Sequence, residues 1–203
     1  MNNNEYSGKI SLGAGIIASL LIPVIITLLL ITNSLEFGNL TISNLSRLGQ
    51  EGEKTAGLFN SAIIIGGILT IVFAIGLRRR TEIIGRSGFA IFIAAATALT
   101  SIGIFNIPDP NHNASAILFF SLMPIALLVM GTNIIRNYSG NISTILIHKT
   151  GFGTFVSGIV LSVLSFLMII FHSNYLMILE LGVIFSSSFW LLAFGRKLLV
   201  KNY

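Results

Sequence analysis

Six long apolar runs, separated by short segments in which lysine and arginine gather, constrain this chain more than any other feature. Four stretches contain no charged side chain, namely 10–35, 55–77, 87–108 and 110–135, and the stretch 150–195 contains one charge, Glu180. Charged residues make up 9% of the chain, against roughly 25% in ordinary soluble domains. A water-facing surface needs more charge than this, so the pattern predicts an all-α, polytopic integral membrane protein.

A spanning helix needs about 20 apolar residues, and the sequence predicts a six-transmembrane-helix bundle in one membrane domain, residues 1–203. We expect the helices near 10–32, 56–77, 88–105, 115–135, 151–171 and 175–194. The last two must be separate, because one helix from Lys149 to Arg196 would measure roughly 70 Å. The first run exceeds the apolar core of a secretory signal, so we expect it to remain as the first helix.

The basic residues predict the orientation of the bundle. With six crossings, ten of the twelve lysines and arginines fall on one side of the membrane, and Arg47 and Lys54 fall on the other. The positive-inside rule therefore places both termini in the cytoplasm and the protein in the cell (plasma) membrane. Acceptor sequons at Asn39, Asn44 and Asn113 would then face outward, and whether they carry glycan stays open.

We expect the lipid bilayer to be the main partner of the chain, and other membrane subunits or a second copy are further candidates. Nucleic acid is not expected, although the net charge is +5. The basic residues border the apolar runs, where orientation in the membrane explains them better.

Most polar side chains that could support chemistry fall on the predicted outer side. The expected outer polar cluster comprises Ser43, Arg47, Asn60, Asp109, His112, His172 and Glu180. Glu180 lies about 7–8 Å below the outer end of its helix, by the rise per residue. Ionisable groups at such depth usually face the bundle interior, so we expect Glu180 to point inward and pair with Arg47, Lys54 or an outer histidine. The outer loop between the first two helices contains apolar residues, among them Leu45 and Leu48, and is expected to lie over the bundle.

No motif for catalysis, a cofactor or a metal is present. The chain has no cysteine and contains no phosphate loop, dinucleotide fingerprint or ligand-spaced histidine pair. We therefore expect no cofactor, no metal centre and a non-catalytic protein that senses or organises lipid or serves as a subunit of a larger membrane complex.

Two alternatives stay open. A carrier for a small molecule, lipid or ion would use an outward-facing polar cavity lined by Asn60, Glu180 and Ser187, since Ser187 lies seven residues after Glu180 on the same helix face. An outer-face metal-dependent hydrolase or transferase would be built on four side chains with suitable zinc-ligand chemistry. They are Asp109, His112, His172 and Glu180.

Three strings of residues carry a resemblance to a known family. They are Ile42-Ser43-Asn44-Leu45-Ser46, then Gly57-Leu58-Phe59-Asn60 running into Gly66-Gly67-Ile68-Leu69, and Gly103-Ile104-Phe105 followed by Pro108 and His112. Together they resemble the prokaryotic six-helix membrane family catalogued as domain of unknown function 998, itself distantly similar to the Frag1/DRAM/Sfk1 membrane proteins. The family has no established reaction, and the resemblance draws attention to Ser43, Asn60 and His112.

Overall fold

The computed structural model describes residues 3–32, 45–50, 54–80, 85–136, 142–170 and 176–195. Six long helices account for most of these residues. They are α1 (Asn3–Thr32), α2 (Ala56–Arg80), α3 (Arg86–Ile104), α4 (Pro110–Arg136), α5 (Ile142–Ile170) and α6 (Leu176–Trp190). Two short elements complete the description, the 3-10 helix η2 (Leu45–Gly49) and the π-helical turn η3 (Leu191–Gly195) that continues α6.

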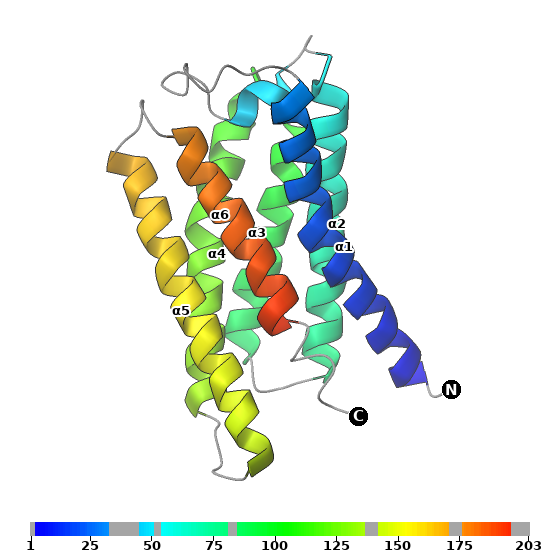
Figure 1. The fold of residues 1–203 in the computed structure, drawn as a ribbon, viewed down its shortest axis with the longest axis vertical. Helices are drawn as coiled ribbons and strands as arrows, with labels where there is room; N and C mark the ends of the chain where they lie inside the picture. The colour runs from blue at the N-terminus through cyan, green and yellow to red at the C-terminus, as the bar shows by residue number, and fades with distance from the viewer. Residues whose placement is uncertain are drawn as a thin grey trace.

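The helices run up and down side by side, as Figure 1 shows, and their contacts close into a ring. Each helix contacts the next one in sequence, and α6 with η3 returns to contact α1. All six contain a segment long and apolar enough to cross a membrane, which confirms the six predicted spans. We call the end of the bundle at which η2 lies the η2 end, and α1 begins and α6 ends at the opposite end (Figure 1).

Helices α1, α2, α4 and α5 extend beyond the predicted apolar cores at one end or both, because hydropathy locates the membrane-embedded part of a helix and not its ends. The clearest case is α4, which begins at Pro110 and not near Ser115. Asp109 Oδ1 accepts a hydrogen bond from the Asn111 backbone N–H at 2.8 Å. This is the arrangement of a helix N-cap, and proline is favoured at the first helical position.

Trp190, the one tryptophan of the chain, has a fully buried side chain that packs between helices. Its ring meets Phe73 of α2 and Phe92 of α3 edge-on, with centroids 6.5 and 5.4 Å away. Its indole N–H donates to Thr154 Oγ1 of α5 at 3.1 Å. One side chain from α6 thereby contacts three other helices.

Small residues let α4 and α5 approach closely, as membrane helices commonly do. A Cβ at Gly158 would lie 2.8 Å from the Leu128 backbone nitrogen, and one at Gly151 would lie 2.6 Å from the Ile134 side chain. The face of α5 that carries Gly151 and Gly158 therefore meets α4.

Candidate functional site

The η2 helix lies across one end of the bundle and is tied at its start by α6. The backbone N–H of Leu45 donates to Glu180 Oε2 at 2.7 Å, and this bond is buried. Glu180 itself is 7% exposed, so its carboxylate points inward as predicted. A carboxylate at this depth needs a hydrogen-bond donor, and a main-chain amide provides one.

The other end of η2 is tied to α2. Asn60 Nδ2 donates to the Gly49 carbonyl at 3.1 Å, and the Thr55 hydroxyl, just before α2, donates to the Leu48 carbonyl at 3.2 Å. A Cβ at Gly49 would collide with Asn60 Oδ1, so only glycine allows this approach. Three side-chain hydrogen bonds from two regions of the chain thus hold five residues of η2.

Apolar burial adds to these bonds. Leu45 and Leu48 are 4% and 5% exposed and belong to the hydrophobic core, which confirms that this part of the loop lies over the bundle. Arg47 is exposed on η2. Among the described residues, Glu180 forms no ion pair with a lysine or arginine, and its observed partner is the Leu45 amide. Of the expected partners, Arg47 and Lys54 do not pair with Glu180, because the amide of the docked loop supplies the donor. The outer histidine His172 lies outside the described residues.

Asp109 and His112 lie at the same end of the bundle, in the turn from α3 to α4. Asp109 caps α4 as described above. His112 is 4% exposed, and its Nδ1–H donates to the Phe105 carbonyl at 2.7 Å. Both side chains therefore hold the connection between two helices.

Two members of the expected cluster, Ser43 and His172, lie outside the described residues. Of the other five, Arg47, Asn60 and Glu180 gather around η2, whereas Asp109 and His112 make their hydrogen bonds within the α3–α4 turn. Within the described part of the chain, no three histidine, aspartate or glutamate side chains lie close enough to hold a metal ion.

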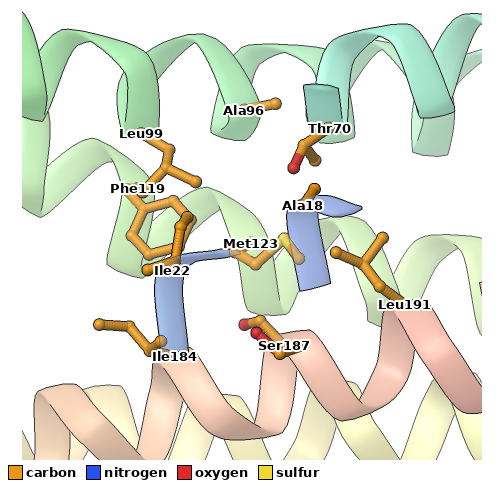
Figure 2. A pocket seen from close by; sticks show the side chains of 11 residues that line it. Ala18, Ile22, Thr70, Ala96, Leu99, Phe119, Met123, Ile184, Ser187 and Leu191 are labelled. Carbon is orange, nitrogen blue, oxygen red and sulfur yellow. The ribbon is translucent and has the colours of Figure 1, made fainter. Parts of the chain in front are cut away.

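A cavity of about 30 Å³ lies between the helices (Figure 2). Its lining comes from α1, α2, α3, α4, α6 and η3, and consists of Ala18, Ile22, Thr70, Ala96, Leu99, Phe119, Met123, Ile184, Ser187, Ser188 and Leu191. Of the three residues expected to line a carrier cavity, Ser187 does so. Asn60 and Glu180 instead hold η2.

The sequence did not indicate the main-chain groups of Leu45 and Gly49 as binding partners, and it did not single out Thr70. The signal for η2 was the presence of apolar residues, Leu45 and Leu48 among them, in the loop between the first two spans.

Comparison with known proteins returned one family. A family model described as "Protein of unknown function (DUF998)" matches residues 16–197. No curated protein and no solved structure matches the chain. The match covers most of the chain, including α2 to α6 and the residues that hold η2, and it confirms the resemblance that the three sequence strings indicated.

Proposed function

Because the chain belongs to the DUF998 family of proteins of unknown function, we propose that it acts as a non-catalytic integral membrane protein that organises a lipid or another membrane subunit, and that α5 is its contact face. The observation that carries this proposal is the low burial of α5. Within the membrane-spanning part of α5, 22% of residues are buried, against 50% in α1.

The exposed side of α5 is a continuous apolar stripe. Its members are Phe152, Val156, Ile159, Val160, Val163, Phe166, Ile169 and Ile170. Six of them recur at alternating steps of four and three residues, from Phe152 to Ile170. That spacing is typical of the contact line between two packed helices. Large apolar side chains along such a line favour a partner whose surface is complementary to them.

Photo-crosslinking tests this proposal. Because the chain contains no cysteine, a single introduced cysteine is the only site at which the probe attaches. Val163→Cys and Phe166→Cys would carry a thiol-linked benzophenone in native membranes. Val24→Cys on α1 and Ile125→Cys on α4 are matched controls, because both side chains are exposed and apolar. We expect the two α5 positions to give one adduct of defined mass, which mass spectrometry identifies as a lipid or a protein. Identical mixtures of bulk lipid at all four positions would contradict the proposal.

A carrier of an ion or another water-sized solute is the second candidate, and it would use the cavity between the helices, entered from the η2 end. Access from that end would require η2 to leave its place on Asn60 and Glu180. In the cysteine-free chain, we expect Ser187→Cys to react faster with a membrane-impermeant thiol reagent when Glu180→Leu removes the acceptor of the Leu45 amide. Glu180→Gln retains an acceptor and is the control. Leu127→Cys is a second control, because Leu127 is fully buried and does not line the cavity. A faster reaction at this position would indicate that the whole bundle has loosened. Equal rates for Ser187→Cys in all backgrounds would exclude gating by η2.

In the proposed orientation, the bundle lies in the plasma membrane and both termini face the cytoplasm. Exposed Lys54 directly precedes α2, which begins at the η2 end, and exposed Arg136 is the last residue of α4, which ends at the opposite end. The basic residues near Arg136 support a cytoplasmic position for that end. An impermeant maleimide is expected to label Lys54→Cys in intact cells and Arg136→Cys after lysis. The reverse pattern would contradict the orientation.

A further inference from the structure

Among the described residues, the Ser187 hydroxyl is the buried side-chain polar group that has no hydrogen-bond partner. In this chain the serine and threonine hydroxyls of the helices are commonly bonded to the carbonyl one turn earlier on the same helix, as in Thr70 to Gly66, Thr154 to Thr150 and Ser162 to Gly158, each at 2.8 Å. This is the usual way to satisfy a hydroxyl in hydrocarbon. Ser187 Oγ is buried and has no hydrogen-bond partner among the described protein atoms.

Ser187 faces the cavity from α6, and Thr70 faces it from α2 (Figure 2). Ser187 is 7% exposed and Thr70 is 5% exposed. Thr70 gives its proton to the Gly66 carbonyl, so its oxygen remains an acceptor toward the cavity. Ser187 can both donate and accept. The two walls therefore suit a guest that donates one hydrogen bond and accepts another.

The size of the cavity selects the guest. A single water needs roughly 10–15 Å³ of such space, whereas an engineered cavity of about 150 Å³ admits benzene. At about 30 Å³, the cavity accommodates water and excludes an acyl chain or a metabolite. We propose that it is a hydration site within the membrane, in which water donates to Thr70 Oγ1 and accepts from the Ser187 hydroxyl. The site lies seven residues, or about 10 Å, along the same face of α6 from Glu180.

Radiolytic labelling in ¹⁸O water tests this site, because hydroxyl radicals formed from a bound water oxidise the side chains that touch it. Met123 lines the cavity and is 3% exposed, and Met130, seven residues later on α4, is fully buried away from it. With the intact protein in nanodiscs, we expect Met123 to take up ¹⁸O about tenfold more than Met130, since methionine sulfur oxidises readily. Equal, low labelling of the two would overturn the proposal. It would mean that the space is dry and that Ser187 bonds its own helix.

Paired variants connect the label to the two hydroxyls. Ser187→Ala with Thr70→Val removes the two hydroxyls that would hold the water and leaves Ser188 as the one polar residue in the lining. Cavities with apolar walls stay dry. We expect labelling of Met123 in this variant to fall to that of Met130. Ser162→Ala is the matched control, because it removes a hydroxyl bonded within its own helix, and it should leave Met123 unchanged. Undiminished labelling in the double variant would also overturn the proposal, and unaltered Trp190 fluorescence shows that the variants fold.

Discussion

The Glu180 carboxylate accepts a hydrogen bond from the Leu45 backbone N–H at 2.7 Å, and the two residues are 135 positions apart. This bond joins the last helix of the bundle to the segment between the first two. It explains why a charged residue lies within an apolar span: the carboxylate accepts a hydrogen bond from a main-chain N–H that is buried away from water.

Replacing Glu180 by leucine is expected to loosen η2. The Leu45 amide would lose its acceptor while staying buried, which costs about 1–3 kcal/mol. Hydrogen exchange measured over residues 45–50 should rise by roughly 5–150-fold. Glu180→Gln retains an acceptor oxygen and should change exchange much less. If leucine and glutamine give equal exchange, the bond does not hold η2.

Replacing Asn60 by aspartate is expected to release the other end of η2. The change keeps the shape of the side chain but removes the Nδ2 donor to the Gly49 carbonyl, at a cost of about 1 kcal/mol. Because Glu180 and Asn60 hold the same short helix, we expect Asn60→Asp combined with Glu180→Leu to increase exchange over residues 45–50 by less than the sum of the single effects. Full additivity in free energy would mean that the two ends of η2 open independently.

Replacing Asp109 tests whether it acts as a helix cap. Asp109→Ala is expected to destabilise the protein by about 0.5–2 kcal/mol, because the Asn111 N–H loses its acceptor. Asp109→Ser retains a capping oxygen without the carboxylate and should recover most of the loss. Unfolding in a mixed-micelle titration with SDS measures both. A serine variant as unstable as the alanine variant would show that the carboxylate has a role other than capping.

Replacing Thr154 by valine is expected to change the tryptophan signal. Valine removes the acceptor of the Trp190 indole N–H, so emission should shift to shorter wavelength and stability should fall by about 1 kcal/mol. Thr154→Ser keeps the hydroxyl and should resemble the native protein. Ser157→Ala is the control on the same helix, because the Ser157 hydroxyl donates to the Gly153 carbonyl one turn earlier in α5. An unshifted spectrum in Thr154→Val would contradict the bond.

The membrane character, the six spans and the inward direction of Glu180 could be derived from sequence, because each depends on local properties. Hydropathy over about 20 residues identifies a span, and the pair Asp109-Pro110 carries the preferences of a helix start, although hydropathy alone placed that start too late. The leucines at 45 and 48 indicated that the loop would be buried. These inferences require no knowledge of which helix lies beside which.

The partner of Glu180 could be decided only by the tertiary structure. It is a backbone N–H, which every residue except proline possesses, so no pattern of side chains distinguishes Leu45 from its neighbours. The same holds for the Gly49 carbonyl bonded by Asn60, and for the meeting of Ser187 and Thr70 at one cavity. Sequence determined which segments hydrocarbon would solvate. The packing of the six helices decided which polar groups meet inside the bundle. Those contacts join helices that are far apart in the sequence, so they depend on how the helices are arranged in space.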